Sequence, residues 1–222
     1  EMALRAFPAT LQLAFATMLL AIVGAVVVGC WAAYRPNSLA DRFSSLLSMT
    51  AASIPDFWFA ITGVWLFAVL LGVLPTSGVD AGVLSWILPV ATLMIRPLGV
   101  LTQVVRGAMV SALSAPYIRL ARSKGAGDFR VVSHHALRNA AAPALTVAGD
   151  LMVSLINGAV VVEAIFGWPG IGKLMIDAIL QRDFAVLQAA VLLTAVSIFL
   201  LNIIIDACYA LLDARVREPA RV

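Results

Sequence analysis

Residues 116–143 read PYIRLARSKGAGDFRVVSHHALRNAAAP and place a basic, helix-forming stretch inside an otherwise apolar chain. Of the 222 residues, 62% are hydrophobic and only 12% are charged, and the mean hydropathy is +1.01. A soluble domain could not bury that much apolar surface. The sequence therefore predicts an all-helical integral membrane protein in which this stretch, the basic insert, faces water and offers a docking place for a soluble partner.

Five apolar runs predict transmembrane helices, because each can cross a hydrocarbon core of about 30 Å at about 1.5 Å rise per residue. They cover residues 8–31, 44–73, 86–110, 143–165 and 184–209. We expect Pro8 at the start of the first helix, where its missing N–H group costs nothing. Ile54, Pro55 and Asp56 fall inside the second run, so we expect a kink there and place the lipid-length part at residues 57–74.

The distribution of Lys and Arg predicts the orientation of the chain, since these residues stay preferentially in cytoplasmic loops. One side of the membrane holds only Arg5, Lys173 and Arg182. The other side collects Arg35, Arg42, Arg106, Arg119, Arg122, Lys124, Arg130, Arg138, Arg215, Arg217 and Arg221. We therefore expect the N-terminus outside, and the basic insert and the C-terminus in the cytoplasm. An odd number of spans with an external N-terminus also leads us to expect that a preceding span is missing.

Local signals within the basic insert predict two helices joined by a glycine turn. Pro116 opens a helix over residues 117–124, and Gly125 follows as a left-handed cap. Asp128 is expected to cap a second helix, which ends where Pro143 begins the next span. So many charges cannot lie in hydrocarbon, so the unit is expected beneath the membrane. A solvated loop that grips anionic lipid headgroups is an alternative that periodicity does not separate.

The basic insert resembles the cytoplasmic EAA loop of ABC-type import permeases, specifically that of the oligopeptide, dipeptide and nickel branch. YIRLARSKG and HHALRNAAAP carry the resemblance, with Gly125 at the loop glycine, Ala121 at a small position and Pro143 at the closing proline. Ser123 replaces an alanine, and the acidic residue that names the loop is absent, as is usual in this branch. Further similar segments are PATLQL (8–13), SIPDFW (53–58), GVLPTSG (72–78), VVVEAIFGWPGIGKL (160–174) and DARVR (213–217).

The resemblance implies a type I ABC importer permease fold in a bacterial inner-membrane subunit similar to the B-type dipeptide permease. It implies one permease domain over residues 1–222, with a coupling loop at 111–142 and an extracytoplasmic loop at 166–183. The implied activity is ATP-driven import of peptides or similar small solutes. The implied partners are a second homologous permease in a heterodimer, two ATP-binding subunits, an extracytoplasmic substrate-binding protein and membrane lipid. ATP and Mg would bind to the partner subunits, so we expect this chain to be non-catalytic and to bind no cofactor or nucleic acid.

A coupling role for the loop is also implied by the resemblance: a short, glycine-bent helical joint would lie in a groove of one ATPase subunit. The two aromatic residues of this joint are candidate anchors in the groove. Its basic residues are candidates for charges at the rim of the contact, where they would tune the rate of association. The glycine would fix the angle between the helices. The candidate coupling residues are Tyr117, Ala121, Arg122, Lys124, Gly125, Phe129 and Arg130.

The loop at residues 166–183 contains the turn FGWPG followed by an amphipathic stretch at 171–180. Its expected apolar side comprises Ile171, Leu174, Met175, Ala178 and Ile179. Such a helix would lie at the membrane interface. It could plug the outer mouth of the bundle or contact the binding protein, and the two roles are compatible.

Polar side chains inside the spans are candidates for the substrate pathway, because ionisable groups are costly there. Arg96 could recognise a substrate carboxylate, although pairing with Asp150 or snorkelling is the favoured interpretation. Gln103 and Asn157 are candidates for the pathway or for hydrogen bonds between helices.

Two other classes stay open: a secondary, ion-coupled transporter and an intramembrane enzyme. The first would show pseudo-symmetric halves, and no convincing repeat is visible. The second needs a nucleophile and a base on facing spans, and the candidates are scattered. The sequence contains no GxxxxGK[ST] loop for ATP. His134 and His135 are adjacent, so on a helix they point about 100° apart, and no ligand cluster accompanies them; we expect no metal site.

Overall fold

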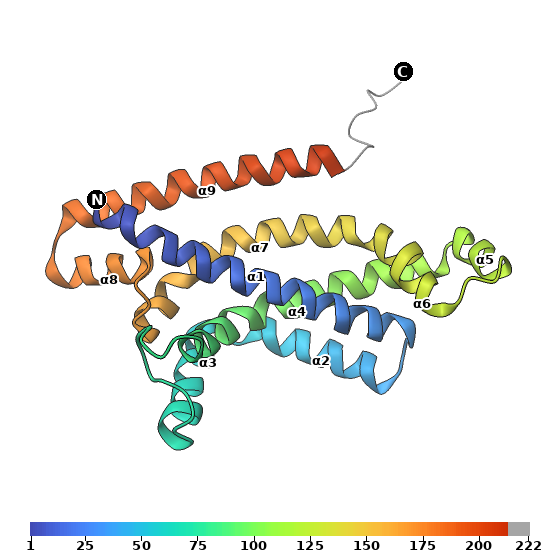
Figure 1. The fold of residues 1–222 in the computed structure, drawn as a ribbon, viewed down its shortest axis with the longest axis horizontal. Coiled ribbons are helices and arrows are strands. Elements are labelled where there is room, and N and C mark those ends of the chain that lie inside the picture. The colour runs from blue at the N-terminus through green and yellow to red at the C-terminus, as the bar shows by residue number, and fades with distance from the viewer. Residues whose placement is uncertain (213–222) are drawn as a thin grey trace. The chain divides into compact units, whose positions relative to one another are not determined.

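The computed structural model describes the backbone of residues 1–212 and their side chains apart from 40, 52 and 208–212. Within this part of the chain every regular element is a helix, which confirms the all-helical prediction. The helices are α1 (Met2–Tyr34), α2 (Leu39–Ser53), α3 (Asp56–Gly63), η1 (Val64–Leu70), α4 (Leu84–Ser114), α5 (Pro116–Ser123), α6 (Asp128–Arg130), η2 (Val131–Ala136), α7 (Leu137–Phe166), α8 (Ile171–Gln181) and α9 (Phe184–Leu212) (Figure 1). DARVR and the last three arginines of the orientation count lie outside the described residues.

Four helical runs among the described residues are long and apolar enough to cross a membrane. They are Met2–Tyr34, Leu84–Ser114, Asp128–Phe166 and Phe184–Ala207. The number rises to five if the broken pair of helices from Asp41 to Leu70 counts as one span. Four of the five predicted spans are therefore found, and the second corresponds to the broken pair.

Two prolines that we expected at helix starts lie inside helices. α1 begins at Met2, because the apolar residues before Pro8 continue the helical run. α7 contains Pro143 and forms one run with α6 and η2 from Asp128 to Phe166. Proline is tolerated within membrane helices because neighbouring groups satisfy the backbone carbonyl that it frees. The second helix of the basic insert and the fourth span are therefore continuous.

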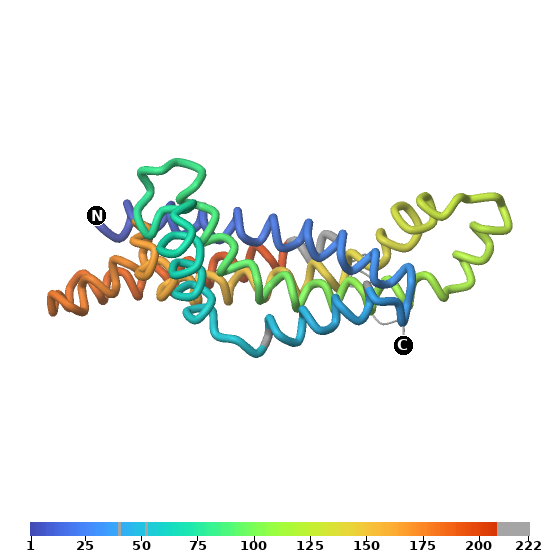
Figure 2. Tube along the Cα trace, turned by 90° about the horizontal axis from the view of Figure 1, so that it is seen from below, coloured from blue at the N-terminus to red at the C-terminus, as the bar shows by residue number. Residues whose placement is uncertain are grey.

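The second span is broken at Ile54 and Pro55. α2 ends at Ser53, Pro55 is extended with φ −64° and ψ 143°, and α3 begins at Asp56. The residue before a proline is biased away from the α region, which explains the break and confirms the predicted kink. The helix then continues only to Leu70, not to residue 74, because Gly72 turns with φ +63° into a loop at residues 71–83 (Figure 2).

The chain divides into two compact units. The first comprises Glu1–Leu20, Ile54–Ile95 and Leu151–Ile205, and the second comprises Ala21–Ser53 and Arg96–Asp150 with the described residues from 206. The core of the second unit contains Ala33, Val105, Met109, Ala112, Ile118, Val131, Ala136 and Ala140. A smaller cluster in the first unit contains Ala3, Ile171 and Ala190. The basic insert thus belongs wholly to the second unit and α8 wholly to the first. The predicted bounds of the permease domain and of its two loops stay predictions.

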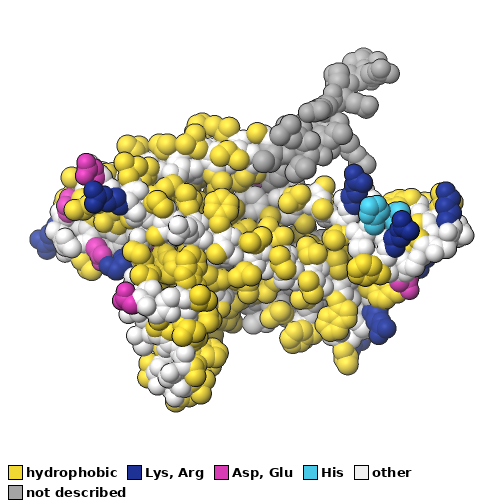
Figure 3. Space-filling view, viewed as in Figure 1, with side chains coloured by type: hydrophobic (Ala, Val, Ile, Leu, Met, Phe, Trp, Pro, Cys, Tyr) yellow, Lys and Arg dark blue, Asp and Glu magenta, His cyan; other side chains and the backbone are white. Residues whose placement is uncertain are grey.

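Polarity is distributed as expected for lipid surroundings. Large apolar side chains such as Phe15 and Phe199 are exposed on the spans, whereas Thr10, Ser44 and Thr102 are buried. Figure 3 shows the apolar side chains that cover the spans. Small and polar residues between helices let the backbones approach closely, which is how helices associate in lipid.

Candidate functional site

The turn of the basic insert is built by a proline and a glycine. α5 begins with Pro116 after the extended Ala115, and Gly125 follows its end with φ +84°. The Gly125 N–H group donates to the Arg122 carbonyl at 2.9 Å, and the Ala126 N–H group donates to the Ala121 carbonyl at 3.1 Å. This pair of bonds defines a Schellman motif, which requires a left-handed residue at the glycine position. The predicted glycine cap is therefore confirmed.

The side chain that holds α5 in place is Ile118, which is 1% exposed and packs in the cluster that contains Met109 of α4 and Val131 of η2. The sequence analysis did not single out Ile118. The two predicted anchors for a partner lie on the surface: Phe129 is 87% exposed and Tyr117 is 41% exposed. The Tyr117 hydroxyl accepts a hydrogen bond from the Asn139 amide at 3.1 Å. Both aromatic rings are therefore accessible.

Cationic groups gather around the turn (Figure 3). Arg122 makes an exposed ion pair with Asp128 at 3.6 Å. An open pocket beside the turn is lined by Ala121, Lys124, Gly125, Ala126, Arg130, His134 and His135. Five of the seven predicted coupling residues thus lie at one turn, and the other two, Tyr117 of α5 and Phe129 of α6, lie on the helices that flank it.

The helix after the turn begins differently from the prediction. Its N-cap is Gly127, and Asp128 is the first helical residue, where its charge complements the helix dipole. The π-helix η2 follows at Val131–Ala136. The rings of His134 and His135 meet edge to face there, with centroids 5.5 Å apart. Among the described residues, no three His, Cys, Asp or Glu side chains gather as a metal site would require.

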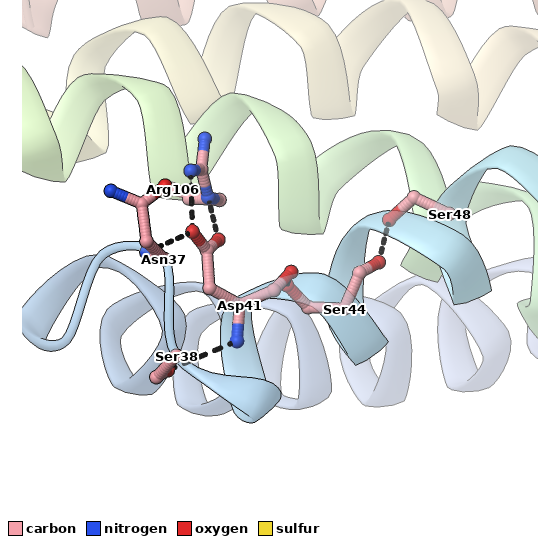
Figure 4. A network of polar contacts seen from close by, with 6 residues as sticks. All are labelled: Asn37, Ser38, Asp41, Ser44, Ser48 and Arg106. Atoms are coloured by element: carbon pink, nitrogen blue, oxygen red, sulfur yellow. Dashed lines mark hydrogen bonds and ion pairs between the residues drawn. The ribbon is translucent and has the colours of Figure 1, made fainter.

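A partly buried ion pair joins α2 to α4 in the same unit (Figure 4). The Asp41 carboxylate accepts hydrogen bonds from Nε of Arg106 and, at 2.8 Å, from its Nη2. It also accepts the Asn37 N–H group at 2.8 Å, and the Asp41 N–H group donates to Ser38 Oγ at 3.3 Å. The side chains of Asp41 and Arg106 are 6% and 32% exposed.

The sequence analysis missed this pair, because it counted Arg106 only as a loop charge and gave Asp41 no role. The stretch Ser38-Leu39-Ala40-Asp41 did contain a signal, since Ser or Thr three residues before an acid marks a helix start. Removing one partner of a fully buried pair costs about 3–5 kcal/mol. Arg106 keeps about a third of its surface exposed, so we expect a cost at or below the lower end here.

The predicted pathway residues are exposed on the helices that carry them. Arg96 and Gln103 lie on one face of α4, and Asp150 and Asn157 lie on one face of α7, since each pair is separated by two helical turns. Arg96 and Asp150 do not pair, because they are not among the four ion pairs of the described residues, and snorkelling of Arg96 stays a prediction. Both side chains instead reach the surface of their unit.

α8 is held by polar contacts within the first unit. Glu163 is fully buried, and its Oε2 accepts the N–H groups of Gly172 at 2.8 Å and Lys173 at 3.4 Å. Thr10 Oγ1 accepts the Ile171 N–H group at 2.9 Å. Trp168 of the preceding turn donates to the Ala9 carbonyl at 3.1 Å.

The predicted apolar side of α8 is mostly correct. Ile171 and Ala178 are buried, and Leu174 and Met175 are partly buried. Ile179, the fifth residue of the predicted apolar side, is 54% exposed, so that side is buried in part and open in part.

Comparison with known proteins agrees with the resemblance of the insert. Residues 25–218 match the family described as binding-protein-dependent transport system inner membrane component. The di/tripeptide transport system permease protein DppB of Pseudomonas aeruginosa (strain UCBPP-PA14) is 39% identical over 96% of this chain and 71% of its own length. The dipeptide transport system permease protein DppB of Bacillus subtilis (strain 168) is 34% identical over 98% of this chain and 70% of its own length.

Solved structures give the same fold. A chain of the MetNI methionine ABC transporter in an inward-facing conformation superposes with a TM-score of 0.78 at 17% identity, covering 96% of both chains. The protein is thus an all-helical, multi-pass inner-membrane permease with the fold of ABC importers. More particularly, the chain belongs to the family of binding-protein-dependent transport system inner membrane components.

Proposed function

We propose that this chain is one of two homologous permease subunits in a heterodimer that imports peptides. Support comes from relatives named for dipeptide or di/tripeptide transport, of whose length this chain covers more than two thirds. A binding protein outside the membrane delivers the peptide, and two ATPase subunits bind ATP and Mg and perform the hydrolysis. The permease itself catalyses no reaction and holds no cofactor.

In this proposal the N-terminus is outside, and the basic insert and the C-terminus are cytoplasmic. The uneven distribution of Lys and Arg supports this orientation. The ATPase subunit receives the turn around Gly125, with Phe129 and Tyr117 as anchors and Arg122, Lys124 and Arg130 at the rim. The observation that carries the proposal is the contrast between a buried attachment at Ile118 and an outward aromatic side chain at Phe129. A side chain as large as Phe129 stays in water at a cost, which contact with a partner removes.

The polar residues exposed on α4 and α7 are proposed to line the translocation pathway. Arg96, Gln103, Asp150 and Asn157 reach the surface of otherwise apolar helices. Such groups are costly against lipid and are expected to face a water-filled cavity. Arg96 is then available to a peptide carboxylate.

The test is uptake of labelled alanyl-alanine by the complete complex in proteoliposomes, with wild type, Gly125→Val and Gly127→Val. Gly125 has open space around it but a left-handed backbone, so valine strains the turn; Gly127 also has open space but an ordinary φ of −66°, so it is the matched control. We expect Gly125→Val to insert and assemble normally but to lose about tenfold in uptake per ATP hydrolysed. Gly127→Val should keep most of the uptake.

Two results would contradict the proposal. Wild-type uptake that follows a proton or sodium gradient and persists without ATP would favour the ion-coupled transporter. Equal uptake by the Gly125→Val and wild-type complexes would remove the coupling role of the turn.

A further inference from the structure

α2 and α4 meet at two places that lie two turns apart on each helix. At one place Asp41 binds Arg106. At the other, a Cβ atom added to Gly99 would approach the Ala51 Cβ atom to 2.9 Å and the Ser48 Cα atom to 3.2 Å. Asp41 and Ser48 are seven residues apart, as are Gly99 and Arg106, so one face of each helix makes both contacts in an antiparallel arrangement.

The face of α2 toward α4 is small and polar. Asp41, Ser44, Ser48 and Ala51 are buried, whereas Leu39, Phe43, Leu46 and Met49 are exposed. The hydroxyl groups of Ser44 and Ser48 donate to carbonyls of α2 itself, so they make no bond to α4. In lipid there is no hydrophobic drive for two helices to associate. The ion pair is therefore the one directional bond between α2 and α4 among the described residues.

The same helix α4 carries the basic insert. Arg106 is followed one turn later by Met109, which packs with Ile118 of α5 and Val131 of η2. A displacement of α5 must therefore reach α4 close to Arg106. α2 in turn ends at Ser53, before the break at Ile54 and Pro55, so it can be displaced as one short helix.

We propose that Asp41 and Arg106 are positioning residues that make α2 move together with α4 when the basic insert is displaced. The proposal rests on the proposed function, in which an ATPase subunit displaces the insert. The bidentate guanidinium contact resists sliding and rotation of one helix against the other. The close packing of small residues at Gly99 has no directional bond and resists neither. Asn37, whose φ is +63°, fixes the carboxylate from the turn before α2.

The test compares the complete complex carrying wild-type permease, Asp41→Ala/Arg106→Met and Arg42→Gln. The double variant removes both charges, so no unpaired buried charge is left to prevent folding. Arg42→Gln is the matched control, because it removes an exposed cation next to Asp41 and leaves the pair intact. Spin labels at Leu46→Cys on α2 and Val110→Cys on α4, in a background of Cys30→Ala and Cys208→Ala, report the distance between the helices.

We expect one narrow distance in wild type and Arg42→Gln, unchanged between the ATP-free complex and the complex trapped with vanadate. In the double variant the distance should change by about 2 Å or more on trapping, the size of typical helix shifts. Its uptake of alanyl-alanine per ATP hydrolysed should fall about fivefold while ATP turnover stays within about twofold.

An unchanged distance together with wild-type uptake per ATP in the double variant would overturn the proposal. If that variant does not assemble, Arg106→Lys takes its place, because it keeps the charge but loses the bidentate contact. It should show a smaller change of the distance on trapping. An unchanged distance in this variant would overturn the proposal. A wild-type complex that traps vanadate but takes up no alanyl-alanine would count against the peptide substrate alone. The distance measurement would still decide the role of the pair.

Discussion

The basic insert and the α8 region are both short helices attached to long spans through a buried isoleucine, but α8 has buried hydrogen bonds at its N-terminus in addition. α5 is held by an apolar side chain, Ile118, and leaves its aromatic and basic groups outside. α8 is held by hydrogen bonds to Glu163 and Thr10, which occupy its N-terminal groups. A helix fixed by polar contacts at its end stays in one orientation, whereas a helix with a free outer face can receive a partner. The difference is the one that the proposed docking of a partner at the insert requires.

The largest loss of stability is expected from Ile118→Ala. The substitution removes a buried apolar side chain between α4 and η2, and such changes cost about 2–5 kcal/mol. Thermal unfolding of the purified complex in detergent measures the loss. Leu120→Ala, on the exposed side of α5, is the control and should change little. Equal melting temperatures for the two variants would mean that Ile118 is not the attachment of α5.

A smaller loss is expected from Glu163→Ala. The buried N–H group of Gly172 loses its acceptor, which costs about 1–3 kcal/mol, whereas the Lys173 N–H group is only partly buried and loses a longer contact of 3.4 Å. Glu163→Gln should recover most of the stability, because its amide oxygen can still accept. Protease cleavage within α8 and the melting temperature are the measurements, with the exposed Gln181→Ala at the end of α8 as control. If the Gln variant were as unstable as the Ala variant, the capping role would be wrong.

The smallest effect on stability is expected from Phe129→Ala. The ring is almost fully exposed, and surface substitutions of this kind change the free energy of unfolding by about 0.5 kcal/mol or less. Retention of the ATPase subunits during purification should nevertheless fall strongly, since aromatic side chains dominate binding at interfaces. If Phe129→Ala lowered the stability of the complex but left the ATPase subunits bound, the basic insert would not be the docking region and its distinction from α8 would fail.

Local signals in the sequence were sufficient where one or two residues decide the backbone. Pro116 and Gly125 predicted both ends of α5, and Pro55 predicted the break in the second span. The same reasoning failed at Pro8 and Pro143, because a proline in a membrane helix does not have to begin one.

The supports of the site could not be predicted, because they join residues far apart in the chain. Arg106 is 65 residues from Asp41, and Ile171 is 161 residues from Thr10. The sequence pattern identified each as charged, polar or apolar but held no information about which helices would become neighbours. The motif alone, in contrast, was enough to name Phe129 and Lys124, both exposed, as candidate coupling residues.

The central claim is that the outward face of the basic insert contacts an ATPase subunit in the cytoplasm. The most direct measurement places a photoreactive phenylalanine analogue at position 129, irradiates the assembled complex in membranes and identifies the adduct by mass spectrometry. The account predicts an adduct with an ATPase subunit. An adduct with lipid alone, or labelling of Phe129→Cys by an impermeant reagent from outside the cell, would contradict it.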